Sequence, residues 1–192
     1  CDPYKLRLEE GRAAPPCLVY SVGSNGEADF EQAVHDHISA ECEIHTFDIN
    51  PWEYYTDRLS EAMPSFMNFH VGAIGVSGES YSRSAINSPW KDWMVNHHLG
   101  WIVGSKKLPD ARAKSIADIV RELGHTGRTI NLFKIDCEGC EYATYREWFG
   151  AGVDIQQVLV ELHWQDKEKA RGLHEFMQSM GYVIFHKEPN TF

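Results

Sequence analysis

The stretch Cys17-Leu-Val-Tyr-Ser-Val-Gly-Ser-Asn-Gly-Glu27 decides the fold, because a short apolar run is followed at once by a glycine turn. Residues 17–22 are mostly apolar and rich in β-forming side chains, which is typical of a buried strand. Beyond the turn, apolar residues recur at helical spacing and predict a helix over 28–40. A strand, a tight turn and a helix in this order form the first unit of a parallel α/β sheet, in which ligands bind beside the turn.

The rest of the chain continues this alternation of strands and helices. Further strands are predicted at 44–48, 68–76, 130–136, 157–162 and 182–185, and further helices at 51–62, 116–123, 141–149 and 167–180. The helix at 116–123 is the best marked, because Ser115 and Asp118 form a capping box and Gly124 can end it. Short connections between such elements favour parallel pairing with right-handed crossovers. The predicted fold is therefore an α/β, Rossmann-like three-layer sandwich with a mostly parallel sheet.

Two segments interrupt the alternation within the single domain that we expect over 1–192. Residues 1–16 are polar and are interpreted as an N-terminal arm. Residues 77–114 form a segment too long for a plain connection, so we expect them to cover or shape a site. Its aromatic residues and histidines are interpreted as anchors of the segment rather than as a sugar-stacking surface; they are Trp90, Trp93, His97, His98 and Trp101. Because the sequence begins at Cys1, we expect it to start partway into a longer product.

The charge and the cysteines restrict the partners and the compartment. Lys and Arg total 18 against 28 Asp and Glu, a net charge of -10, which argues against a nucleic acid or an anionic membrane as the partner. The five cysteines allow one or two disulfides, which would indicate an oxidising compartment, or free core thiols. As the compartment of the protein, we favour the secretory-pathway lumen over the cytoplasm. No thioredoxin-like pattern surrounds Cys137 and Cys140, so packing thiols, or one partner of a disulfide, are favoured over redox catalysis there.

The first candidate binding site combines the glycine turn with the end of the second predicted strand. Asp48 follows Gly23 by 25 residues and can accept hydrogen bonds from ribose hydroxyls. A dinucleotide fingerprint would require glycine at 23, 25 and 28, but Asn25 and Ala28 stand at the last two. The pattern therefore favours a nucleoside ligand without a pyrophosphate, such as S-adenosylmethionine. The alternative is a plain tight turn beside a solvated carboxylate.

The second candidate site lies at the ends of the fourth and fifth predicted strands. Asp136, Glu138 and Glu141 follow one strand and could orient an ammonium group, hold a metal or accept a proton. Helix N-terminal acidity explains Glu141 well and Asp136 poorly. Glu161 and His163 end the next strand on one side, and His163 is either a general base or a structural residue. A divalent metal held by these side chains is an open alternative to the metal-free polar cluster that we favour.

Four ordered motifs together resemble the FkbM-type methyltransferases, in their eukaryotic methyltransferase-like branch. The motifs are Cys17–Gly26, Glu43-Ile-His-Thr-Phe-Asp48, Leu123-Gly-His125 and Lys134-Ile-Asp-Cys-Glu-Gly-Cys-Glu141, and the resemblance covers roughly residues 17–188. It implies a class I fold with strand order 3-2-1-4-5-7-6 and S-adenosylmethionine as the methyl donor, usually for O-methylation. The chain departs from this pattern because it ends before a seventh strand, which we expect to be missing or truncated.

The resemblance also implies roles for individual residues. The implied cofactor-binding residues are Gly23, Ser24, Asn25, Gly26, Asp48, Ile49 and Asp136, with the turn at the methionine part and Asp48 at the ribose. The resemblance implies that Asp136 and Glu138 face the methyl-transfer site, and the residues that end the fifth predicted strand, Glu161 and His163, complete the expected catalytic group. The expected acceptor is a hydroxyl on a small molecule or a glycan. A non-catalytic binding or scaffold domain of the same fold is the alternative, and a nicotinamide-dependent reductase is disfavoured by the missing glycines.

Overall fold

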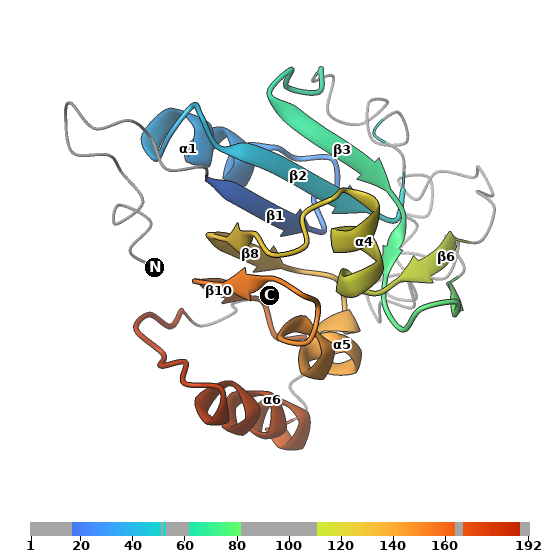
Figure 1. Cartoon of the computed structure of the whole chain (residues 1–192), viewed down its shortest axis with the longest axis vertical. Coiled ribbons are helices and arrows are strands. Elements are labelled where there is room, and N and C mark those ends of the chain that lie inside the picture. Colours follow the sequence, from blue (N-terminus) through green and yellow to red (C-terminus); the bar gives the residue numbers. More distant parts are fainter. Residues whose placement is uncertain (1–16, 51, 53–61, 82–110, 164–166, 189–192) are drawn as a thin grey trace, which may run out of the picture.

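A computed structural model of the chain describes residues 17–50, 52, 62–81, 111–163 and 167–188 (Figure 1). Its central sheet has five parallel strands in the order β10-β8-β1-β2-β3. The bounds of these strands are Leu18–Val22 for β1, Glu43–Asp48 for β2, Met67–Val71 for β3, Leu132–Ile135 for β8 and Val158–Val160 for β10. This order equals 3-2-1-4-5 of the predicted sheet, so the Rossmann-like α/β prediction is confirmed.

Helices cover both faces of this sheet. On one face, α1 (Asp29–His37) places Val34 against Val19 and Ile44. The other face carries α4 (Ile116–Glu122), α5 (Cys140–Trp148) and α6 (Lys167–Ser179), and α6 packs against α5 (Figure 1). The capping box predicted at Ser115 and Asp118 is present at the start of α4. None of the described helices is long and apolar enough to span a membrane.

The core between the sheet and the helices α4 and α5 is tightly packed. All five residues of β1 are buried, and the ring of Trp148 packs edge-on against Phe133 at 5.2 Å between centroids. Both side chains are fully buried, as is Tyr20. Because tightly packed interiors leave little room for movement, residues that follow these strands are held in fixed positions.

Two of the predicted strands are each divided in the structure. Residues 68–76 separate at Gly72 into β3 and β4 (Ala73–Ile74), and β4 pairs with β6 (Ala111–Lys114) rather than with the main sheet. The short β5 (Ser80–Tyr81) pairs antiparallel with β6, so both ends of the long 77–114 segment are tied to the body. Its residues 82–110, with the Trp and His cluster, lie outside the described residues.

The fourth predicted strand is likewise interrupted, at Asn131. Its first part, β7 (Thr129–Ile130), pairs with β9 (Asp154–Ile155) in a separate two-stranded sheet, and its second part is β8. Most of the predicted helix at 51–62, namely 51 and 53–61, and the predicted arm at 1–16 lie outside the described residues.

The prediction of a strand at 182–185 is wrong. No described strand pairs with this segment, and Val183, Ile184 and Phe185 are 77%, 63% and 55% exposed. Only Tyr182 is anchored, by a hydrogen bond from its hydroxyl to the carbonyl of Ile155 and by packing against Phe149. Apolar density resembles that of a strand, but a strand also needs a neighbouring edge with which to exchange hydrogen bonds.

Two disulfides settle the pairing of four cysteines that the sequence left open. Cys17–Cys42 joins the residues that precede β1 and β2, with 4.5 Å between the Cα atoms. Cys137–Cys140 closes the loop between β8 and α5. The second disulfide therefore lies at the edge of the main sheet where β1, β2 and β8 end, which is called the rim below. Cys1 lies outside the described residues.

Candidate functional site

The glycine turn after β1 is in direct contact with the end of β8. Gly23 has a φ of 78°, and its N–H donates to the carbonyl of Phe47 at 2.8 Å. A Cβ at this position would lie 1.6 Å from the carbonyl oxygen of Asp136, so only glycine fits. The two predicted halves of the site, the turn and the β8 end, therefore meet at this contact.

Asp48, at the end of β2, holds the glycine turn in shape. Its Oδ2 accepts hydrogen bonds from Ser24 N at 2.9 Å, Ser24 Oγ at 3.1 Å and Asn25 N at 3.0 Å. Its Oδ1 accepts from Asn50 N at 2.9 Å, and the residue is 6% exposed. This positioning role was not predicted from the sequence, and the contact with a ribose stays a prediction.

The remaining residues of the predicted cofactor group lie beside Asp48. Gly26 N donates to Ser24 Oγ at 3.2 Å, which closes the turn. Ile49 packs against Ala73 and Ala113, where β4 meets β6. The structure therefore brings Gly23 to Gly26, Asp48 and Asp136 together, with Ile49 at the border of the group.

Lys134 adds a cation whose role was not predicted from the sequence. Its Nζ donates to the carbonyl of Gly23 at 2.5 Å and lies 3.5 Å from Oδ2 of Asp136. Alternation along β8 places Lys134 and Asp136 on one side, and this Lys-x-Asp spacing is the signal that could have revealed it. The rim thus offers a cation and an anion next to the turn.

The buried Glu141 and the partly buried His163 form a pair behind the rim. The Oε1 of Glu141 accepts hydrogen bonds from His163 N and from His163 Nδ1, both at 3.0 Å, and its Oε2 accepts from Gly139 N at 2.9 Å. Glu141 is fully buried, so the helix N-terminal acidity proposed for it from the sequence explains only its bond to Gly139. Its main role, which is to hold His163, was missed.

The charge states of this pair follow from its contacts. Burial acts to raise the pKa of Glu141, but hydrogen bonds from His163 and the backbone outweigh it, so the pKa lies below its ordinary value. The hydrogen bond to Glu141 raises the pKa of His163, against the opposing effect of burial. Because an ionised carboxylate only accepts, Nδ1 of His163 carries a hydrogen and Nε2 is left to face the rim.

Three carboxylates surround Nε2 of His163. Asp136 Oδ1 lies at 3.5 Å, and Glu138 Oε2 and Glu161 Oε1 each lie at 3.9 Å. The His163 side chain is 12% exposed, whereas that of Glu138 is 52% exposed. Burial, with a contribution from neighbouring carboxylates, raises the pKa of Glu138 despite the opposing effect of His163. The four predicted catalytic residues are thus brought together.

The same cluster has a geometry that could hold a cation. One ligand atom each from Asp136, Glu161 and His163 lies within 4.8 Å of the others. Oxygen and imidazole nitrogen suit Mg²⁺, Mn²⁺ or Zn²⁺. The cluster is therefore compatible both with a bound divalent cation and with the metal-free arrangement favoured from the sequence.

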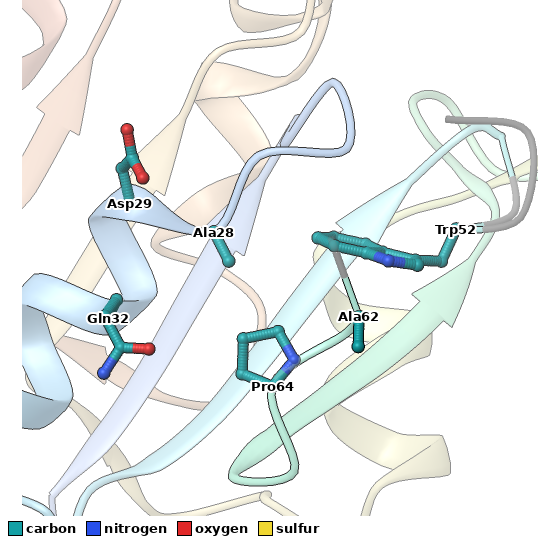
Figure 2. A pocket seen from close by; sticks show the side chains of 6 residues that line it. All are labelled: Ala28, Asp29, Gln32, Trp52, Ala62 and Pro64. Carbon is teal, nitrogen blue, oxygen red and sulfur yellow. The ribbon is translucent and has the colours of Figure 1, made fainter. Parts of the chain in front are cut away.

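A separate cavity of about 300 Å³ lies on the α1 side of the sheet. Figure 2 shows its lining residues, with Trp52 and Pro64 across from the first turns of α1; the six are Ala28, Asp29, Gln32, Trp52, Ala62 and Pro64. None of them belongs to the predicted catalytic or cofactor group. The chemistry-bearing side chains gather at the strand ends instead, so we place the candidate site there.

Comparison with known proteins agrees with this architecture. A protein-family model described as a methyltransferase domain matches residues 1–192. No curated protein and no solved structure matches the sequence. The family match spans the whole chain, and the five-stranded parallel sheet has the topology expected of a class I methyltransferase. The chain belongs to this methyltransferase domain family.

Proposed function

We propose that the chain is an S-adenosylmethionine-dependent methyltransferase of the FkbM type that methylates a hydroxyl on a small molecule or a glycan. The observation that carries the proposal is the Glu141–His163 pair, which presents Nε2 to the rim beside the glycine turn. A buried carboxylate that orients a histidine is the arrangement by which proteins prepare a general base.

The donor set at the rim fits the methionine part of the cofactor. Asp136 is about one-third exposed and can accept hydrogen bonds from the ammonium group, while Lys134 can pair with the carboxylate. The turn from Gly23 to Gly26 follows β1, where class I ligands approach the backbone, and Asp48 lies behind it. When bound, S-adenosylmethionine supplies an electrophilic methyl group on a sulfonium.

The residues of the chain then handle the proton and the alignment. Nε2 of His163 would accept the proton that the acceptor hydroxyl loses when its oxygen takes the methyl group. Glu141 stabilises the imidazolium that results, through its bond to Nδ1. Glu138 and Glu161 flank Nε2 and can orient the acceptor's other polar groups.

The disulfides and the charge support a setting for this reaction. Two disulfides among the described residues support an oxidising compartment, and we propose the secretory-pathway lumen. The net charge of -10 favours a small-molecule or glycan acceptor over a nucleic acid and over direct contact with an anionic membrane.

The proposal is tested by measuring release of S-adenosylhomocysteine against a panel of hydroxylated small molecules and glycans. The proposal is supported if turnover depends on one acceptor class. His163→Gln should lower this turnover, and the exposed His186→Gln should leave it unchanged. Cofactor binding without turnover on any acceptor would instead favour the non-catalytic binding domain.

A further inference from the structure

A second cluster of titratable side chains lies on the sheet away from the methyl-transfer rim. Glu43 and His45 are at the start of β2, and His125 follows α4. Glu43 and Asp48 are the two ends of β2, five residue steps apart, which is roughly 16 Å. The cluster therefore lies toward the opposite end of the strand from the glycine turn, and the proposed reaction makes no use of it.

The three side chains converge on one point. Nε2 of His45 lies 2.9 Å and Nε2 of His125 lies 3.2 Å from the same oxygen, Oε1 of Glu43. One ligand atom from each residue lies within 4.8 Å of the others. Two histidines and one glutamate are a ligand set that proteins use in zinc sites with an open coordination position.

Each histidine is oriented by an outer partner. Nδ1 of His45 lies 2.8 Å from Nε2 of His70 on β3, and Nδ1 of His125 lies 2.7 Å from the hydroxyl of Tyr20 on β1. Metal-binding histidines are held in this way, with one ring nitrogen on the metal and the other in a hydrogen bond. Both rings therefore already present Nε2 in the direction that coordination requires.

The outer partners of both rings can exchange donor and acceptor roles with Nδ1. While Nε2 of each ring donates to Glu43, the Nδ1 atoms accept from His70 and Tyr20. If an ion took the place of the two Nε2 hydrogens, each Nδ1 would donate instead, and both His70 Nε2 and the Tyr20 oxygen can accept. Binding thus requires a change of tautomer in His45 and His125, and a change from donor to acceptor at His70 Nε2 and at the Tyr20 oxygen.

The surroundings also fix the carboxylate and leave it accessible. Glu43 directly follows Cys42, whose disulfide to Cys17 ties the starts of β1 and β2, and Glu43 N donates to the carbonyl of Cys17 at 2.8 Å. The second oxygen, Oε2, lies 2.7 Å from Arg128. The Glu43 side chain is 39% exposed while both histidines are buried, so an ion and a water could reach the site from one side.

We propose that Glu43, His45 and His125 form a zinc-binding site, with solvent as the fourth ligand, that stabilises the sheet apart from the methyl-transfer rim. Zinc is preferred over Mg²⁺ or Ca²⁺ because two of the three ligands are imidazoles. The position at the amino end of β2, next to a disulfide, indicates a structural role. The two functional proposals are independent, since no residue is shared between the sites.

The test is calorimetric titration of ZnCl₂ into the untagged chain after treatment with a chelator. We expect one equivalent to bind, with affinity at least tenfold weaker in Glu43→Gln and in His125→Gln. His163→Gln, which alters the rim, and His37→Gln, which removes an exposed histidine of α1, should bind as the unaltered chain does. Absence of saturable binding in the unaltered chain, or loss of binding in His163→Gln, would overturn the proposal.

Two further readouts keep the test decisive if His125→Gln fails to fold. Saturation with zinc at about 100 times Kd should raise the Tm of the unaltered chain by about 5–10 °C and leave that of Glu43→Gln unchanged. Cobalt in place of zinc should give the absorption of a four-coordinate ion, and Tyr20→Phe should weaken zinc binding by about tenfold. An equal rise of Tm in Glu43→Gln would contradict the site.

Discussion

The carbonyl oxygen of Asp136 occupies the space where a side chain on Gly23 would begin, 1.6 Å from the position of its Cβ. This contact joins the first strand's turn to the end of the fourth strand of the sheet. It therefore fixes the distance between the two parts of the candidate site, and any residue larger than glycine must move one of them.

Replacement of Gly23 by alanine should destabilise the fold by about 3 kcal/mol or more, because it combines positive φ with a backbone clash. Gly127→Ala is the matched control: its φ is 79°, but nothing lies within 4 Å of its Cβ position. Only the conformational cost, about 1 kcal/mol, applies there. Denaturant unfolding of both variants checks this, and equal losses would refute the close approach.

The pH dependence of turnover should report the Glu141–His163 pair. His163 accepts a proton only when neutral, and its bond to Glu141 raises its pKa above the ordinary value of a histidine. The rate should therefore rise with pH through this raised pKa, and Glu141→Gln should move the rising limb to lower pH while lowering kcat. An unshifted limb in Glu141→Gln, measured under saturating substrate, would mean that another group titrates.

His163→Gln should lower kcat by about 10²-fold or more and leave cofactor affinity within about twofold, because the side chain meets the acceptor's proton. His186→Gln, at an exposed histidine of the C-terminal segment, is the control. Turnover and binding are measured on the same preparations. Loss of cofactor binding in His163→Gln would assign the residue to binding and not to proton transfer.

The two disulfides should contribute differently. For the Cys17→Ser, Cys42→Ser double variant, whose cysteines are 25 residues apart, loop-closure entropy predicts a decrease of about 3.5 kcal/mol in the free energy of unfolding. For Cys137→Ser, Cys140→Ser, whose cysteines are 3 residues apart, it predicts a decrease of about 2 kcal/mol. The second double variant should lose more activity, since Glu138 lies between its cysteines. Comparison of unfolding and turnover in both variants checks this, and the reverse order in activity would contradict it.

Turnover should persist in the presence of a chelator, because the acceptor's proton passes to His163 and not to a metal-bound group. The assay is run well below the Tm, in the unaltered chain and in Glu43→Gln, so that loss of a stabilising zinc is not mistaken for loss of catalysis. Activity lost to the chelator in both proteins and restored by one divalent ion would show that Asp136, Glu161 and His163 hold a metal.

The sequence predicted the central sheet because its signals are local. The apolar run of β1, the glycine turn and the capping box at Ser115 each depend on neighbouring residues, and each is found where predicted. The segment at 182–185 shows the limit of such signals: its apolar residues resemble a strand, but pairing depends on an edge that no local pattern reveals.

The sequence predicted which residues come together in the candidate site, but not the hydrogen bonds between them. Asp136, Glu138, Glu161 and His163 come together because the ends of neighbouring parallel strands meet at one edge. The partners of Glu141 and Lys134 were missed, since they depend on how α5 and the turn sit relative to the strand ends. The disulfide pairing was left open for the same reason.

We propose that the turn at Gly23 and the end of β8 bind one adenosyl ligand. This binding is measured by calorimetric titration of S-adenosylhomocysteine into the folded chain, with a chelator present. We expect one equivalent to bind with Kd of about 1–100 µM, weakened at least tenfold by Asp136→Asn and unchanged by Asp154→Asn on β9. A folded, unaltered chain that takes up no S-adenosylhomocysteine, or binds it equally well in Asp136→Asn, would contradict the account.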